Sequence, residues 1–187
     1  LPQNCVLSLA IDGSDKWIGT GEGGLAKFDD TNWIVYDTSN SELPDNYIRT
    51  LAIDGSNIWI GTWNGLAKFD DTNWIVYDTT NSGLPDNSVT SLTLDYSNIW
   101  IGTGEGGGLA KFDGTDWMYY ETSNSGLPSN QAVSITIDEN NNKWIGTYGS
   151  GIAKFDNTNW TVYNTSNSGL PDDEVLAVAV EGDNIWA

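Results

Sequence analysis

The chain contains no histidine among its 187 residues, and it has one cysteine, one methionine and seven basic side chains. Without histidine there is no imidazole to act as a general base or a metal ligand, which excludes His-dependent catalytic triads. A single cysteine, Cys5, excludes an internal disulfide. Because Cys5 falls in an apolar strand pattern, we expect its thiol to be buried and inert.

Basic residues are scarce relative to acidic ones. Seven Lys and Arg stand against 26 Asp and Glu, which gives a net charge of −19. Phosphate backbones and anionic membrane surfaces repel such a chain, so we expect no nucleic-acid partner. No run of about 18 apolar residues is present, so no membrane span is expected either. Neutral ligands, cations and basic partners stay open.

The chain does have a repeat of about 42 residues, a period that indicates a repeat architecture. Trp-Ile-Gly-Thr recurs at Trp17–Thr20, Trp59–Thr62, Trp100–Thr103 and Trp144–Thr147, and Trp186-Ala187 begins a fifth copy. Leu-Pro keeps the same spacing, starting at Leu1, Leu43, Leu84, Leu127 and Leu170. The full units cover residues 1–42, 43–83, 84–126 and 127–169, and a partial unit covers 170–187.

Each unit has the composition of four short strands. In the second unit the segments Tyr47–Asp54, Asn57–Thr62, Leu66–Asp70 and Trp74–Tyr77 are rich in β-branched and aromatic residues, with Gly, Asn, Asp, Ser and Pro between them. Four antiparallel strands in such a unit are typical of a β-propeller blade. We therefore predict an all-β fold: one β-propeller domain over residues 1–187, with four full blades and a partial fifth. Leucine-rich repeats are shorter, and helical repeats need helices.

Several repeated residues are predicted to build the frame of the blade. The first strand of each unit, such as Ile48–Ile53, is apolar on both faces, as in a strand covered on both sides. The glycine of Trp-Ile-Gly-Thr is expected to allow a neighbouring group to come close. The recurrent lysines are expected to pack their stems along an aromatic ring while the amine meets a blade aspartate; they are Lys27, Lys68, Lys111 and Lys154.

The ordered series Trp-Ile-Gly-Thr, Gly-Leu-Ala-Lys-Phe-Asp, Trp-x-x-Tyr and Gly-Leu-Pro-x-Asn-x-Val resembles the two-component regulator propeller repeat, and the resemblance covers the whole chain. It implies an extracytoplasmic propeller, often the periplasmic sensing part of a hybrid histidine kinase linked to polysaccharide use. It implies no catalytic residue and no cofactor. Sensors of that family usually carry complete rings with more blades. This chain, which begins Leu-Pro without a visible signal peptide, is thus expected to be part of a larger ring or to be completed by oligomerisation.

Positions that differ between the near-identical units indicate a candidate ligand site. The loop between the second and third strands reads Gly21-Glu-Gly-Gly, Trp63-Asn, Gly104-Glu-Gly-Gly-Gly and Tyr148-Gly-Ser in turn. In a propeller this loop shares a face with the link between blades, where ligands usually bind. The starts of the first strands vary on the same face. The candidate ligand-binding residues are Trp63, Tyr148, Tyr47, Arg49, Glu22 and Glu105.

Aromatic rings beside carboxylates suit carbohydrate stacking, or a cationic group over a ring. Ordinary drift in solvated loops would produce the same variation, so both explanations stay open at this point.

Two other acidic patterns are weaker. Residues 138–142 (Asp-Glu-Asn-Asn-Asn) start like a calcium loop, but Lys143 stands where glycine is needed and no bidentate glutamate follows. We expect a hairpin turn there and no metal. Adjacent carboxylates such as Asp29-Asp30 do not encode the facing pair of a glycosidase. A resemblance to streptogramin-type propeller lyases would require a histidine base, so we expect no enzyme.

Two functions remain. The first is a non-enzymatic extracytoplasmic binding or sensor module that takes a glycan or a peptide on the face of the variable loops. The alternative is a structural segment that self-assembles into a multi-chain ring, because a blade that ends after its second strand leaves an unpaired edge.

Overall fold

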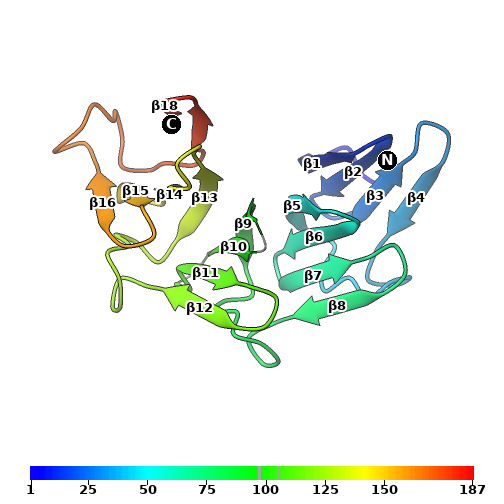
Figure 1. Cartoon of the computed structure of the whole chain (residues 1–187). Helices are drawn as coiled ribbons and strands as arrows, with labels where there is room; N and C mark the ends of the chain where they lie inside the picture. Colours follow the sequence, from blue (N-terminus) through cyan, green and yellow to red (C-terminus); the bar gives the residue numbers. More distant parts are fainter. Residues whose placement is uncertain (97, 105) are drawn as a thin grey trace. The chain divides into compact units, whose positions relative to one another are not determined.

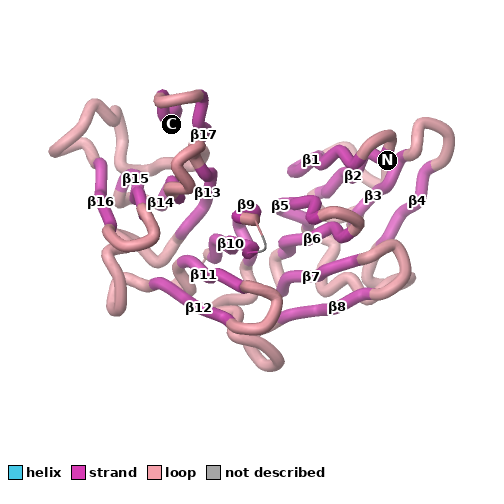
Figure 2. Tube along the Cα trace, viewed as in Figure 1, coloured by secondary structure: helices cyan, strands magenta, loops and turns pink. Residues whose placement is uncertain are grey.

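The computed structural model describes residues 1–96, 98–104 and 106–187, and these residues form strands and turns without any helix (Figure 1; Figure 2). The strands form four sheets of four strands and one sheet of two, and in each large sheet the strand order follows the chain. The predicted all-β fold of four full propeller blades and a partial fifth is confirmed.

The strands of the first two sheets are β1 (Val6–Asp12), β2 (Asp15–Thr20), β3 (Leu25–Phe28), β4 (Trp33–Tyr36), β5 (Ile48–Asp54), β6 (Asn57–Thr62), β7 (Gly65–Phe69) and β8 (Trp74–Tyr77). Those of the next two are β9 (Val89–Asp95), β10 (Asn98–Thr103), β11 (Leu109–Phe112), β12 (Trp117–Tyr120), β13 (Ala132–Ile137), β14 (Lys143–Thr147), β15 (Gly151–Phe155) and β16 (Trp160–Tyr163). The two-stranded sheet pairs β17 (Ala179–Glu181) with β18 (Asn184–Trp186).

The chain divides into two compact units. Unit 1 comprises residues 1–82 and 87–92, and unit 2 comprises residues 83–86 and 93–187. Each unit contains its own apolar clusters.

The turn between the third and fourth strands shows how local sequence shapes a blade. In the second sheet the backbone N–H groups of Thr72 and Asn73 donate to Asp70 Oδ1 at 3.0 and 2.7 Å. The next residue, Asp71, has φ of 69°, in the left-handed region that Asp and Asn tolerate better than most residues. The equivalent positions carry Asp30, Gly114 and Asn157, also with positive φ. Backbone geometry therefore restricts this position to Asp, Asn or Gly in the four full units.

Neighbouring sheets of unit 1 pack through aromatic side chains. Trp17 of β2 stacks with Tyr36 of β4 at 6.3 Å between ring centroids. Phe69 of the second sheet lies 6.2 Å from Trp17 and 5.2 Å from Tyr36, and Trp74 lies 5.7 Å from Tyr36. Aromatic residues on the second and fourth strands of the first sheet thus contact a Phe and a Trp of the second sheet.

The frame role predicted for the glycine is confirmed, and so is the predicted contact of the recurrent lysines with aromatic rings. A Cβ at Gly61 would lie 2.6 Å from Val89 Cγ1 and 2.5 Å from Thr50 Cγ2, so a methyl group has no room there. The ammonium groups of the recurrent lysines lie over the indoles of the second strands. The Nζ-to-centroid distances are 4.7 Å for Lys27 on Trp17, 5.3 Å for Lys68 on Trp59, 6.0 Å for Lys111 on Trp100 and 5.1 Å for Lys154 on Trp144. Lys27 also pairs with Asp15 and Asp71 at 2.9 and 3.0 Å.

The burial predicted for the first strands holds less well at β1 and β17. Leu9 and Ile11 of β1 are 60% and 62% exposed, because β1 packs against β5 on one side only within unit 1. The prediction that Cys5 is buried is wrong. Cys5 is exposed and lies before β1, where its carbonyl accepts a hydrogen bond from Gly21 N–H. The first strand of the partial unit, β17, is short, since its pairing with β18 begins only at Ala179.

Candidate functional site

The frame holds the variable loops in a repeated geometry. In the second sheet Thr62 Oγ1 donates to the carbonyl of Gly65 at 2.8 Å, which closes the loop between β6 and β7. The N–H of Trp63 donates to the carbonyl of Tyr47 at 3.2 Å, which ties that loop to the residue just before β5. The threonines Thr20, Thr103 and Thr147 close the equivalent loops in the same way. The frame therefore fixes the backbone while the loop side chains are free to vary.

The loops of unit 1 enclose a pocket, which we name the Tyr47–Trp63 pocket. It has a volume of about 520 Å³ and is lined by Gly21, Glu22, Asp45, Asn46, Tyr47 and Trp63. The rings of Tyr47 and Trp63 meet edge to face, with centroids 5.8 Å apart and planes at 71°. Trp63 is 49% exposed, so much of its indole is available to a ligand.

Arg49 orders one wall of this pocket. Its guanidinium carbon lies 5.2 Å from the centroid of the Trp63 ring. Nη1 of the same side chain donates to Ser88 Oγ at 3.2 Å. A guanidinium held over an indole in this way stabilises the ring in one position.

Two acidic residues also line the pocket. Glu22 is exposed, and its backbone N–H is held by Gln3 Oε1 at 3.0 Å. Asp45, which also lines the pocket, accepts the N–H of Tyr47 at Oδ1 at 2.7 Å. Two aromatic rings with two carboxylates favour a neutral polyol or a group with positive charge.

Four of the six residues predicted for the site come together in unit 1: Glu22, Tyr47 and Trp63 line the pocket, and Arg49 stacks on Trp63. Tyr148 belongs to unit 2, where it is 52% exposed and its N–H donates to the carbonyl of Gln131 at 3.1 Å. Glu105 lies outside the described residues.

Two lining residues were missed, Asp45 and Asn46. They belong to the Leu-Pro-Asp-Asn link, and the link repeats closely between units, so a search for variable positions passes over it. The link is expected on the same face as the variable loops, and this position could have indicated Asp45 and Asn46.

Unit 2 holds a buried ion pair that the sequence analysis also missed. Lys143 is fully buried, and its Nζ lies 2.7 Å from Asp95 Oδ2. The same ammonium donates to Asn157 Oδ1 at 2.7 Å and lies 5.1 Å from the centroid of the Trp100 ring. Burial by itself would raise the pKa of Asp95, but the hydrogen bond and charge of Lys143 outweigh burial and lower that pKa. We assign this pair to structure, because it is closed to solvent.

The residues considered for calcium are occupied by a hairpin turn. Asp138 Oδ1 accepts the N–H of Asn142 at 2.8 Å, and Oδ2 accepts Trp144 Nε1 at 2.9 Å. Burial would raise the pKa of Asp138, yet these hydrogen bonds lower it. Within residues 1–96, 98–104 and 106–187, no three Asp, Glu, Cys or His side chains gather as a metal site would require. The same part of the chain also has no helix able to cross a membrane.

Comparison with known proteins agrees with the architecture. The model of the two component regulator propeller family matches residues 42–64 and 83–105. The chain has no significant match among curated proteins. Among solved structures, the extracellular domain of BT3049 from B. thetaiotaomicron, assigned as a hybrid two component system, is 26% identical with a TM-score of 0.82. That match covers 96% of this chain and 26% of the other, so the present chain spans about a quarter of its relative.

More distant structures share the fold alone. The designed protein Ika8 is 14% identical with a TM-score of 0.69, over 96% of this chain and 54% of that one. An ancestral GH74 enzyme is 17% identical with a TM-score of 0.67, over 90% of this chain and 24% of that one. Both the family match and the similarity to BT3049 agree with the motifs in the sequence. The chain is thus a set of β-propeller blades in which residues 42–64 and 83–105 match the two component regulator propeller repeat.

Proposed function

We propose that the chain is a non-enzymatic, extracytoplasmic binding or sensor module that takes a glycan or a peptide in the Tyr47–Trp63 pocket. The observation that carries the proposal is the meeting of Tyr47 and Trp63 in a pocket of about 520 Å³. No other blade has an aromatic residue at both positions: Tyr47 is replaced by Cys5, Ser88 and Gln131, and Trp63 by Gly21, Gly104 and Tyr148.

The frame supports binding because it orders the loops before a ligand arrives. Main-chain hydrogen bonds join Trp63 to Tyr47 and Gly24 to Asn46, at 3.2 and 3.0 Å. A preformed pocket lowers the entropy cost of ordering side chains on association. The pair of acidic residues, Glu22 and Asp45, disfavours anionic glycans and favours neutral sugars or peptides with Lys or Arg.

The extracytoplasmic location is proposed from the similarity to BT3049, whose solved part is an extracellular domain. The absence of enzymatic activity is proposed from the sequence, since it has no histidine, and from the roles of the pocket side chains. Arg49 and Asp45 are held in contacts that position the loops.

Neutral-glycan and basic-peptide arrays test the proposal. The wild-type chain should give a defined set of hits, and Trp63→Ala should weaken them at least about tenfold, equivalent to about 1.4 kcal/mol. The control is Tyr96→Ala, because Tyr96 is 90% exposed, belongs to unit 2 and is not among the residues that line the pocket. Absence of hits, or equal binding by wild type and Trp63→Ala, would remove the pocket as a ligand site.

A further inference from the structure

The frame of the blades places ammonium groups between an indole and carboxylates. Lys27 Nζ lies 4.7 Å from the centroid of the Trp17 ring. The same atom lies 2.9 Å from a carboxylate oxygen of Asp15 and 3.0 Å from one of Asp71. The face of the indole attracts the cation, and the carboxylates accept its hydrogen bonds. In unit 1, therefore, an indole and two carboxylates together hold one lysine.

Unit 2 holds Lys143 with the same kinds of group. Its Nζ lies 5.1 Å from the centroid of the Trp100 ring and 2.7 Å from Asp95 Oδ2. Asn157 Oδ1 accepts a hydrogen bond from the same ammonium at 2.7 Å. The fold thus uses one chemical combination for an ammonium group at two different positions: an aromatic face, a carboxylate and a further oxygen acceptor.

The Tyr47–Trp63 pocket contains the same groups, and it is open to solvent. Trp63 is 49% exposed, and Glu22 is exposed as well. Two aromatic rings, two carboxylates and an amide line the pocket, from Tyr47, Trp63, Glu22, Asp45 and Asn46. Within the described part of the chain, no lysine or arginine is among the lining residues. The groups that hold an ammonium elsewhere in the fold are therefore present here without a lysine of the chain itself.

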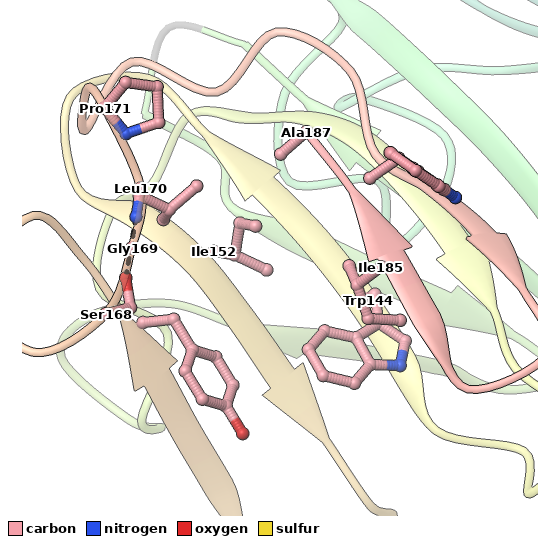
Figure 3. Close-up of a pocket in the computed structure, with 10 residues that line it drawn as sticks. Trp144, Ile152, Ser168, Gly169, Leu170, Pro171, Ile185 and Ala187 are labelled. Atoms are coloured by element: carbon pink, nitrogen blue, oxygen red, sulfur yellow. Dashed lines mark hydrogen bonds between the residues drawn. The ribbon is translucent and has the colours of Figure 1, made fainter.

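A second pocket, of about 460 Å³ in unit 2, shows that the carboxylates are what distinguishes the first (Figure 3). Trp144 and Tyr163 line it together with Ile152, Leu170 and Ile185. Among its described lining residues there is no acidic side chain. Aromatic rings in that pocket thus lack the counter-ions that accompany the rings of Tyr47 and Trp63.

Hydrogen bonding and charge favour an ammonium over a neutral sugar in the Tyr47–Trp63 pocket. The carboxylate oxygens of Glu22 and Asp45 only accept hydrogen bonds, and an ammonium supplies three donors and no acceptor. A sugar hydroxyl can donate to the same oxygens, but it leaves their charge uncompensated. Arg49 carries the opposite charge, and the two carboxylates outnumber it. The net charge of −19 also attracts cations towards the chain.

From these observations we propose that the Tyr47–Trp63 pocket binds the side chain of a lysine in a peptide or protein partner. The ammonium pairs with the Glu22 carboxylate and lies against the aromatic rings, while the apolar stem of the lysine packs along them. This inference rests on the proposed function, because it selects the peptide from the two classes of ligand named there.

The probe is the pentapeptide acetyl-Gly-Gly-Lys-Gly-Gly-amide, whose only charge is the lysine ammonium. The matched control is the same peptide with Nε-acetyl-lysine, which has lost that charge. An NMR titration of the ¹⁵N-labelled chain at low salt follows the indole N–H of Trp63 and the backbone N–H of Tyr47. The lysine peptide should shift both signals to saturation, and the acetylated peptide should bind at least about fivefold more weakly.

Two protein variants locate the ammonium. Glu22→Gln should weaken binding of the lysine peptide roughly threefold, a modest factor because an exposed ion pair contributes little. Glu139→Gln removes the same charge from a residue of unit 2 that does not line the pocket, and it should bind like wild type. Raising NaCl from about 0.01 to about 0.15 M should weaken binding to wild type more than binding to Glu22→Gln, because salt screens the ion pair.

The inference is wrong if the lysine peptide leaves both signals unmoved, if the two peptides bind equally, or if Glu22→Gln binds the lysine peptide like wild type. Neutral glycans that bind the wild type and lose binding in Trp63→Ala would then still support the proposed function, with a sugar as the ligand. If neither the peptide nor any ligand on the arrays depends on Trp63, both proposals are wrong.

Discussion

Glycine in Trp-Ile-Gly-Thr is the single residue on which close packing of neighbouring sheets depends most directly. At Gly19 an added Cβ would lie 2.6 Å from Ile48 Cγ2, and at Gly61 it would lie 2.6 Å from Val89 Cγ1. At Gly146 it would lie 2.8 Å from the carbonyl oxygen of Val175. The first strand of the next sheet therefore lies against the glycine, and the motif is conserved between repeats for steric reasons.

We predict that Gly61→Ala destabilises the chain by about 1–3 kcal/mol, the usual cost of overpacking. The methyl group would lie too close to both Thr50 and Val89, and Val89 is fully buried. Urea unfolding followed by circular dichroism measures the change. Gly169→Ala is the matched control, and equal stability of the two variants would contradict the steric argument.

Lys143 and Asp95 link two elements, the start of β14 and the end of β9. The second and third sheets have isoleucine where the fourth has Lys143, namely Ile58 and Ile99. The fold therefore accepts an apolar side chain at this position, whereas in the fourth sheet the buried ammonium of Lys143 lies 2.7 Å from Asp95. The pair couples two strands of adjacent sheets within unit 2.

We predict that Lys143→Ile lowers the stability at pH 7 by about 3–5 kcal/mol, because it leaves the Asp95 carboxylate buried and unpaired. Adding Asp95→Asn to this variant should recover much of the loss, which distinguishes the unpaired charge from a packing defect. Thermal and urea unfolding of the two variants measure both effects.

The effect should also depend on pH, with a sign that follows from the lowered pKa of Asp95. In the wild type this carboxylate stabilises the fold above its unfolded pKa of about 3.9, and the contribution is lost as the pH falls through the lower folded pKa. In Lys143→Ile burial is expected to raise the pKa of Asp95, so protonation relieves the unpaired charge. The stability difference between wild type and variant should therefore shrink between pH 7 and pH 3. A constant difference would contradict the assignment.

At the scale of the whole molecule the charge of −19 opposes compaction. Four of the seven basic residues are the recurrent lysines, and their ammonium groups lie over indoles in the frame of the blades. Most carboxylates lie in turns and links, where hydrogen bonds to backbone N–H groups lower the pKa of Asp29, Asp70 and Asp156. These groups stay charged, so repulsion between them persists near neutral pH.

We predict that the melting temperature at pH 7 rises by several degrees as NaCl is increased from about 0.01 to about 0.15 M, because salt screens repulsion between exposed charges. Scanning calorimetry of dilute protein measures the shift. The same salt series near pH 4.1, the isoelectric point, is the control, and there the dependence should be small. A melting temperature that is unchanged or falls with salt at pH 7 would show that ion pairs outweigh the repulsion.

The sequence by itself determined the elements of this protein. Strands at Asn57–Thr62 and Trp74–Tyr77 were predicted at their observed bounds. Both segments are rich in β-branched and aromatic residues, and turn-forming residues flank them. The period located the blades, and the recurrence of a lysine at the same place in each full unit predicted its packing along an aromatic ring. These features depend on pairing between strands close in the chain, which local sequence specifies.

Only the tertiary structure decided which residues of different blades meet. It brings Glu22 of the first blade to Tyr47 and Trp63 of the second, and it pairs Lys143 with Asp95 of the preceding sheet. It also exposes Cys5, which the apolar pattern had suggested was buried. Side-chain contacts between sheets depend on how each blade packs on its neighbour. The residue pattern within one repeat does not specify that packing.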